Sequence, residues 1–356
     1  MTTAGATMRT MGEDIAELLC LLGLRPVWLG TSERVIGLEV VPLEELGRAR
    51  IDVTLRVSGM FRDAFPNLIE RIEDAVNMVA VLEEPLEQNY VRKHILEECE
   101  ELMQEGEARE TAFERASLRM FGCPANTYGA GVKELVQSKK WETVEDLGEV
   151  YTTWGCHAYG RKIHGETCRA DYIRRMARAD LTVTNASTIE FDVLSSEDFY
   201  NYIGGMIAAI ETHSGSQKRA YVADSADCGH THISSLHEEV SRIMRARVNN
   251  PKWIEGMKQH GYKGAQEISR TVSTLFGLDA TTRVADNWMY ESIAKRYLLD
   301  ETNAQWLQEN NLFALQNITE ILLEASLRGM WDAPDKMLDQ LRELFVSIDG
   351  GIEELD

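Results

Sequence analysis

The chain has 356 residues, of which 44% are hydrophobic and 27% charged, an ordinary composition for a folded protein with more than one domain. Its formal net charge of -21 argues against nucleic acids and anionic membranes as partners, and no apolar run is long enough to cross a bilayer. The six cysteines form no C-x-x-C pair and there is no signal peptide, so we expect reduced thiols and a cytoplasmic protein.

The first 82 residues alternate predicted helices and strands. The elements are an amphipathic helix over 14–22, strand candidates over 25–28, 35–41 and 51–57, and a helix over 61–81. The first helix ends at Gly23, and Ser58-Gly59 forms the turn between the last strand and its helix. A strand, a turn and a helix make up the βα unit of a doubly wound sheet. We therefore predict a helix-rich α/β fold, with Rossmann-like βα units near the N-terminus followed by a mainly helical region with short strands.

Two further segments complete the predicted organisation into 1–82, 83–150 and 151–356. Residues 83–150 are mostly helical and acidic, and residues 151–356 form a helix-rich α/β segment. The loop over 121–131 is rich in glycine, but no Lys-Ser/Thr follows it as in a P-loop, and no Walker sequence occurs in the chain. We therefore expect no nucleotide-hydrolysing site of the P-loop type in this chain.

The sequence W-G-C-H-A-Y-G, which begins at Trp154, places two aromatic residues between glycines. Trp154 and Tyr159 are suited to offer flat aromatic faces to a ligand, although both residue types are also common in protein cores. His157 is a candidate metal ligand, while a lone histidine is more often structural. Both interpretations stay open for these three residues.

A cluster of soft metal ligands consists of Cys228, His230, His232 and His237. Its H-x-H spacing is suited to a first-row metal ion but does not match a structural zinc motif, so a variable surface loop is the alternative. A predicted helix over 234–249 follows, with arginines at positions 242, 245 and 247.

The densest motif reads N-P-K-W-I-E-G-M-K-Q-H-G-Y-K-G and begins at Asn250. Asn250 is suited to cap a helix and Pro251 to occupy its first position. Gly264 opens the next helix, which we place at 265–276. Composition alone predicts a tight corner between two helices.

This motif strongly resembles the N-P-K-W…E-G-M…H-G-Y-x-G signature of the large subunits of the ATP-dependent metal chelatases, the CobN/magnesium-chelatase family. Members insert cobalt into a corrinoid precursor or magnesium into protoporphyrin. Further resembling blocks are R-V-S-G-M-F-R-D at 56–63, N-Y-V-R-K-H at 89–94, the loop at 121–131, and W-G-C-H-A-Y-G at 154–160. The resemblance extends from Met8 to about Trp331. It is nearer the cobalt branch and corresponds only to the C-terminal part of the family's large subunit.

The resemblance implies a set of substrate contacts. Arg56 and Arg62 are expected to bind macrocycle carboxylates, because guanidinium groups form paired hydrogen bonds with carboxylates. The alternative is that one of these arginines pairs with Asp63 and fixes the loop. The aromatic substrate contacts that we expect are Trp154, Tyr159, Trp253 and Tyr262.

Proton and metal handling is expected of a second group of residues. Glu190 or Glu255 is the expected proton acceptor, and His157 or His260 is expected to hand over the metal. Glu190, Glu255 and His260 are thus the expected catalytic residues, and His157 and Asp192 the expected metal ligands. Metal insertion removes protons from pyrrole nitrogens while the metal sheds water, and carboxylates are able to assist both events.

The sequence departs from the expected cobalt pattern beside these acids. Phe191 stands where we expect histidine and Ile189 where we expect arginine, and a phenylalanine cannot bind a metal ion. A different metal or tetrapyrrole, or a loss of activity, is consistent with this departure. Capping of the next helix is the alternative role for Glu190 and Asp192.

The resemblance therefore implies the C-terminal part of a metallochelatase large subunit that acts in cobalamin biosynthesis. Its expected substrates are a divalent metal, Co²⁺ first and Mg²⁺ as the alternative, and a tetrapyrrole. The expected partners are AAA+ ATPase subunits, which hydrolyse the ATP, and a separate N-terminal piece of the large subunit is a further candidate. The alternatives are a magnesium-protoporphyrin chelatase subunit, a non-catalytic tetrapyrrole carrier, or a metal-binding module built on His230, His232 and His237.

Overall fold

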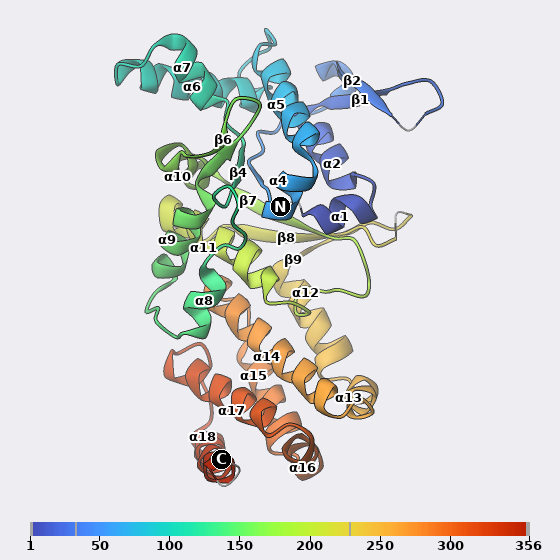
Figure 1. Cartoon of the computed structure of the whole chain (residues 1–356), viewed down its shortest axis with the longest axis vertical. Helices are drawn as coiled ribbons and strands as arrows, with labels where there is room; N and C mark the ends of the chain where they lie inside the picture. The colour runs from blue at the N-terminus through green and yellow to red at the C-terminus, as the bar shows by residue number, and fades with distance from the viewer. Residues whose placement is uncertain (1–2, 33, 228, 354–356) are drawn as a thin grey trace. The chain divides into compact units, whose positions relative to one another are not determined.

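The structure is a computed structural model that describes residues 3–32, 34–227 and 229–353, with side chains up to residue 348. The chain divides into two compact units, which Figure 1 shows coloured along the sequence. The first unit consists of Met1–Ala130 and Val150–Ala179, and the second of Gly131–Glu149 and Asp180–Asp356.

The first unit combines helices with small sheets. Its helices are α1 (Ala4–Arg9), α2 (Glu13–Leu22), α3 (Leu43–Leu46), α4 (Gly59–Ala64), α5 (Pro66–Ala80), α6 (Tyr90–Gln104), α7 (Arg109–Ala116) and α10 (Arg169–Arg178). Its strands are β1 (Leu24–Trp28), β2 (Val35–Val40), β3 (Leu55–Arg56), β4 (Met120–Gly122), β5 (His157–Tyr159) and β6 (His164–Thr167). β1 and β2 form an antiparallel hairpin, while β3 and β4 are parallel and β4, β5 and β6 continue the same sheet antiparallel. The predicted helix-rich α/β class is confirmed.

Two predicted elements of this unit differ from the structure. The strand expected over 51–57 is reduced to Leu55–Arg56, because these are the positions that align with β4, and the backbone of Leu55 donates to the carbonyl of Arg119 at 2.7 Å. The helix expected over 61–81 is divided at Phe65, whose backbone lies at φ -130° and ψ 52°. The next residue is a proline, which lacks an N–H group and disfavours helical geometry in the residue before it.

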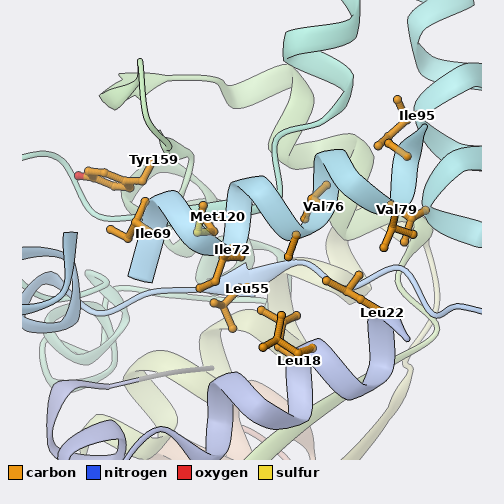
Figure 2. Packing of buried hydrophobic residues seen from close by; sticks show 14 of the residues in the cluster. Leu18, Leu22, Leu55, Ile69, Ile72, Val76, Val79, Ile95, Met120 and Tyr159 are labelled. Atoms are coloured by element: carbon orange, nitrogen blue, oxygen red, sulfur yellow. The ribbon is translucent and has the colours of Figure 1, made fainter. Parts of the chain in front are cut away.

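The hydrophobic core of this unit lies along α5 (Figure 2). Apolar residues of α5 recur every three or four positions and therefore share one face of the helix. Figure 2 shows this face together with residues of α2, β3, β4, β5 and α6, namely Leu18, Leu22, Leu55, Ile69, Ile72, Val76, Val79, Ile95, Met120 and Tyr159. Burial of each large aliphatic side chain contributes about 1.5–3 kcal/mol, so the core holds the short strands in place.

A buried ion pair joins α6 to α10. Glu98 of α6 and Arg175 of α10 are 0% and 4% exposed, and Nη2 of Arg175 donates to Oε1 of Glu98 at 3.0 Å. Arg175 also donates to the carbonyl of Ala116 at 2.9 Å and to that of Leu118 at 3.1 Å. Burial lowers the pKa of Arg175 to about 10, with a further contribution from the nearby charge of Arg119.

The second unit contains a small sheet and a large set of helices (Figure 1). Its strands are β7 (Leu181–Ala186), β8 (Arg219–Asp224) and β9 (His232–Ser235). Its α-helices are α8 (Val132–Gln137), α11 (Gly205–Ser214), α12 (Leu236–Ile243), α13 (Pro251–Lys258), α14 (Tyr262–Thr282), α15 (Asn287–Ile293), α16 (Glu301–Asn310), α17 (Leu312–Leu327) and α18 (Asp335–Glu353), while α9 (Val144–Gly155) begins here and ends in the first unit.

Segments of π-helix interrupt the helices of the second unit. They are η1 (Tyr200–Gly204), η2 (Met244–Val248) and η3 (Ala294–Leu298). η2 continues α12 directly, so the predicted helix over 234–249 is one α-helix that changes to a π-turn. Such turns are rare and occur often at functional sites, because the extra residue changes the direction of the side chains that follow.

None of the helices in the described part of the chain combines the length and apolar character that crossing a membrane requires.

Candidate functional site

The R-V-S-G-M-F-R-D block of the first unit forms the turn from β3 into α4. The hydroxyl of Ser58 accepts from the backbone N–H of Phe61 at 3.1 Å and caps α4. Position 59 requires glycine, because a Cβ atom there would lie 2.6 Å from the ring of Tyr128 and 2.9 Å from the carbonyl of Thr127. The block therefore fixes the loop over 121–131 against α4.

Arg62 is held by this loop. Its guanidinium binds both carboxylate oxygens of Asp63 at 2.7 and 3.0 Å and donates to the carbonyl of Pro124 at 2.9 Å. Tyr128 donates to the same carboxylate at 2.8 Å. The structure thus shows the pairing with Asp63 that the sequence left open, and the side chain of Arg62 is 7% exposed.

Arg56 lies in a buried polar cluster next to this turn. It is 2% exposed, donates to the carbonyl of Val57 at 2.5 Å and lies over the ring of Tyr151 at 5.7 Å. Tyr151 is fully buried, and burial raises the pKa of its hydroxyl. The guanidinium groups of both Arg56 and Arg62 are therefore buried.

The other expected residues of the first unit differ in exposure. Trp154 is 37% exposed, whereas Tyr159 is 4% exposed and donates to the carbonyl of Cys123 at 2.5 Å. Nδ1 of His157 lies 3.4 Å from the carbonyl oxygen of Trp154, which is an acceptor, and this contact would suit a proton on Nδ1. Burial lowers the pKa of His157, which favours the neutral form that binds metal ions.

In the second unit, the candidate acids follow the carboxyl end of β7. β7 and β8 are parallel, so their carboxyl ends lie at one edge of the sheet, where ligands meet such sheets. Glu190 is exposed between Ile189 and Phe191, which are 92% and 48% exposed. Among the residues described, none forms a hydrogen bond or ion pair with the carboxylate of Glu190. This carboxylate is therefore available to a ligand.

Asp192 is joined to the signature helix through Arg247. Nη2 of Arg247 donates to Oδ1 of Asp192 at 2.8 Å, and the guanidinium lies over the ring of Trp253 at 5.4 Å. Oδ1 of Asp192 also accepts from the hydroxyl of Ser195 at 2.9 Å and from the backbone of Leu194 at 3.0 Å. The structure thus brings two expected site residues together, Asp192 and Trp253. Asp192 also stabilises its own loop.

Arg247 is a residue to which the sequence analysis gave no role. It lies on η2, six positions before Trp253, a spacing that is not characteristic of contact on a regular helix. Its contacts to Asp192 and Trp253 arise because the loop after β7, η2 and α13 meet in space. No pattern in the sequence alone indicated this.

The corner between α13 and α14 explains several residues of the signature. The side chain of Asn250 accepts from the backbone of Lys252 at 3.0 Å, and Pro251 begins α13, as predicted. Gly261 has φ +50° and ψ -125°, a conformation that other residues rarely adopt. α14 begins at Tyr262 instead of at Ala265. Gly264 therefore lies within its first turn, where it packs against α13.

The mutation Gly264→Ala tests this corner. A Cβ atom at Gly264 would lie 1.9 Å from the carbonyl oxygen of Met257, so the two helices must separate. We expect the free energy of unfolding, measured in urea by circular dichroism, to fall by about 2–3 kcal/mol. Gly256→Ala is the matched control, because no atom lies within 4 Å of the added Cβ. That variant should be unchanged or more stable by up to about 1 kcal/mol, and equal effects of both variants would contradict the packing argument.

The remaining expected residues lie on or near the surface of this corner. Glu255 is paired with Nζ of Lys258 at 2.8 Å, and its side chain is 66% exposed. His260 is exposed, and its backbone N–H donates to the carbonyl of Met257 at 2.9 Å. Tyr262 is 54% exposed. These residues are accessible to a ligand of the second unit.

Two histidines of the proposed soft-ligand cluster have separate partners, and the third, His232, is exposed at the start of β9. His230 lies 3.0 Å from Oδ2 of Asp227, and Nε2 of His237 lies 3.0 Å from Oδ2 of Asp286. Cys228 lies outside the described residues. In the part of the chain that the structure describes, no group of three or more metal-ligating side chains is placed to hold a metal ion.

Comparisons with known proteins agree with the resemblance. The CobN/Magnesium Chelatase family model matches residues 1–338. The aerobic cobaltochelatase subunit CobN of Pseudomonas aeruginosa is 42% identical over 344 residues, covering 97% of this chain and 28% of that protein. The chloroplastic magnesium-chelatase subunit ChlH of Oryza sativa subsp. japonica is 32% identical over 354 residues, covering 98% of this chain and 25% of that protein.

A solved structure is similar over the same extent. The catalytic subunit of cobaltochelatase from Mycobacterium tuberculosis superposes with a TM-score of 0.94 at 43% sequence identity, covering 98% of this chain and 29% of that one. The chain thus spans between 25% and 29% of the length of these three relatives.

Proposed function

The chain belongs to the CobN/magnesium chelatase family, and we propose that it acts within the large subunit of a metallochelatase in cobalamin biosynthesis. The proposed reaction inserts a divalent metal, Co²⁺ in preference to Mg²⁺, into a tetrapyrrole. The choice of cobalt is supported by the higher identity to the cobaltochelatase subunit, 42% against 32% for the magnesium-chelatase subunit.

The observation that carries this proposal is the arrangement after β7. Glu190 presents a carboxylate with no partner among the described residues, and two positions further on Asp192 binds Arg247, which lies over Trp253. A proton acceptor thus follows the strand end where ligands meet such sheets, and Arg247 links the same loop to an aromatic residue of α13. This arrangement suits a planar substrate that must lose protons.

The proposed chemistry divides between these groups. The carboxylate of Glu190 accepts protons from the pyrrole nitrogens as the metal enters the ring. Asp192 provides oxygen ligands to a metal ion that sheds its water, which requires a change in its bond to Arg247. Trp253 and the exposed Tyr262 contact the face of the macrocycle, while Glu255 and His260 are further candidates for proton transfer.

The first unit has a proposed supporting role. Nε2 of His157 is suited to pass on a metal ion, and the exposed Trp154 is suited to contact a macrocycle. Tyr159, Arg56 and Arg62 lie buried beneath the loop over 121–131 or next to it. We propose that the two arginines would reach the carboxylates of a substrate only if this loop moves.

The energy for insertion is proposed to come from separate AAA+ ATPase subunits, because the chain contains no Walker sequence. These subunits and the remaining part of the large subunit are the proposed partners. The cytoplasm, which contains ATP and keeps thiols reduced, is the proposed location.

A second candidate function is that of a non-catalytic tetrapyrrole carrier. The observation that favours it is Phe191, which is 48% exposed at the position where a histidine was expected beside Glu190. A carrier binds the macrocycle but does not insert metal when ATP and the ATPase subunits are added.

The test is a spectroscopic titration of the whole chain with metal-free hydrogenobyrinic acid a,c-diamide and with protoporphyrin. We expect saturable binding of the corrinoid, weaker binding of protoporphyrin, and about tenfold weaker corrinoid binding by Trp253→Ala, because an aromatic ring contact contributes about 0.5–1.5 kcal/mol beyond the area that it buries. Arg270→Gln, which alters an exposed pair with Glu267 on α14, is the control. No binding of either macrocycle would overturn the proposal that this chain forms the substrate site.

A further inference from the structure

An open cavity of about 560 Å³ lies along α12 and η2 in the second unit. Its lining residues are His237, Glu238, Ser241, Arg242, Arg245 and Ala246. All its lining residues belong to this one helical segment, so the cavity is a shallow hollow that is open to solvent. Two arginines face it in a chain whose net charge is -21, so the cavity contrasts with the acidic character of the whole protein.

The two arginines of this cavity differ in their partners. Arg242 is bound to Glu239 through two contacts of 2.6 and 2.9 Å. Arg245 lies over the ring of Trp288 at 4.8 Å. Within the ranges that the structure describes, no carboxylate lies at ion-pair distance from Arg245. Stacking on Trp288 leaves the edge of the guanidinium, which carries its N–H donors, free for a ligand.

The acids around the cavity are engaged elsewhere. Glu238 accepts from the backbone and from the hydroxyl of Ser235, at 2.9 and 2.8 Å, and so caps α12. Asp286 accepts from the indole N–H of Trp288 at 3.0 Å and lies 3.0 Å from Nε2 of His237. These contacts orient the ring on which Arg245 rests. The acids therefore support the arrangement of Arg245 without neutralising it through a direct ion pair.

The π-turn η2 links this cavity to the Asp192–Arg247–Trp253 cluster. Arg245 and Arg247 are two positions apart on η2, and each lies over a different tryptophan, Trp288 and Trp253 respectively. The hydrogen bond to Glu239 raises the pKa of Arg242, and the nearby charge of Asp192 makes a smaller contribution in the same direction. The cavity and the cluster thus adjoin each other in the second unit.

We infer that this cavity binds a carboxylate side chain of the tetrapyrrole substrate, with Arg245 as the group that recognises it. The inference rests on the proposed function. A planar guanidinium held on an aromatic ring matches the two oxygens of a carboxylate. Arg56 and Arg62, the arginines expected to have this role, are 2% and 8% exposed, whereas Arg245 is exposed.

The experiment compares the free acid of the corrinoid precursor hydrogenobyrinic acid a,c-diamide with its methyl ester in a binding titration of the whole chain. We expect the unmodified chain to bind the free acid about tenfold more tightly than the ester, because one carboxylate–arginine contact is lost in the ester. Arg245→Gln should remove this preference, and Arg245→Lys should restore it in part, because lysine keeps the charge but not the paired donors.

Two further measurements make the outcome unambiguous. Arg270→Gln controls for loss of one positive charge on an exposed helix, and thermal melting checks that each variant is folded. An unchanged preference for the free acid in Arg245→Gln would overturn the inference while the proposed function stands, and no binding of the macrocycle by the unmodified chain would overturn both. Poly-glutamate is titrated in the same way as a substitute for an acidic protein. If Arg245→Gln weakens the binding of poly-glutamate but not that of the corrinoid, the cavity recognises an acidic protein, and the inference is also overturned.

Discussion

Replacing Glu190 by glutamine is expected to slow metal insertion about 10²–10⁴-fold while macrocycle binding changes by less than about threefold. Glutamine has nearly the same shape as glutamate but cannot accept a proton at neutral pH. The side chain is exposed at the carboxyl end of β7, so the substitution should not disturb the fold. The measurement is the rate of cobalt insertion by the proposed chelatase complex, assembled with the proposed ATPase subunits, together with a binding titration.

Glu255→Gln is the comparison variant for this prediction, because Glu255 is the other candidate proton acceptor. Glu255 is also an exposed acid of the second unit, but its carboxylate is already paired with Lys258 at 2.8 Å. If Glu190 is the proton acceptor, Glu255→Gln should keep the rate within about threefold of the unmodified enzyme. The opposite result, a large loss with Glu255→Gln and none with Glu190→Gln, would move the proton acceptor to α13.

Local signals in the sequence predicted the boundaries of elements that depend on one or two residues. Gly23 ends α2 with φ +76°, and Asn250 with Pro251 begins α13. In each case the residue type itself restricts or permits the backbone angles or provides the cap. The division of the predicted helix over 61–81 was available from the same kind of signal, because Pro66 follows Phe65.

Contacts between distant segments were not predictable in this way. The motif analysis identified Asp192 and Trp253 separately, but their connection requires Arg247, which is 55 positions from Asp192. Likewise, Gly264 appeared to mark a helix start, whereas the structure shows a close approach to the carbonyl of Met257. Sequence patterns carry the period of an element and the chemistry of a residue, but not which segments meet.

The exposure of a charged side chain was equally hidden from the sequence. Arg56, Arg62 and Arg245 are the same residue type in polar surroundings, yet the first two are buried and the third is exposed. Arg62 is fixed by Asp63, its neighbour in the chain, and by carbonyls of a loop some 60 residues away. A resemblance in motif identifies candidates of this kind, and only the packing around them separates a structural arginine from one that is accessible to a ligand.

The largest expected loss of stability comes from the buried pair between α6 and α10. Glu98→Gln leaves the guanidinium of Arg175 buried without a negative charge, and removal of one partner of such a pair typically costs about 3–5 kcal/mol. The carbonyls of Ala116 and Leu118 continue to accept from Arg175, but they cannot neutralise its charge. Urea unfolding of the whole chain, followed by circular dichroism, measures this loss in the free energy of unfolding.

Glu105→Gln is the control, because Glu105 and Arg174 form an exposed pair between the end of α6 and α10 at 3.4 Å. Exposed pairs contribute about 0–1 kcal/mol, so this variant should unfold almost as the unmodified chain does. The double variant Glu98→Leu with Arg175→Met separates the two possible sources of the loss. If the cost arises from an uncompensated buried charge, the double variant should recover most of the stability, because replacing a buried pair by apolar residues is often neutral or stabilising. A double variant that loses as much as Glu98→Gln would contradict this explanation, because it no longer contains the buried charge and lacks only the hydrogen bonds of Arg175 to the carbonyls of Ala116 and Leu118.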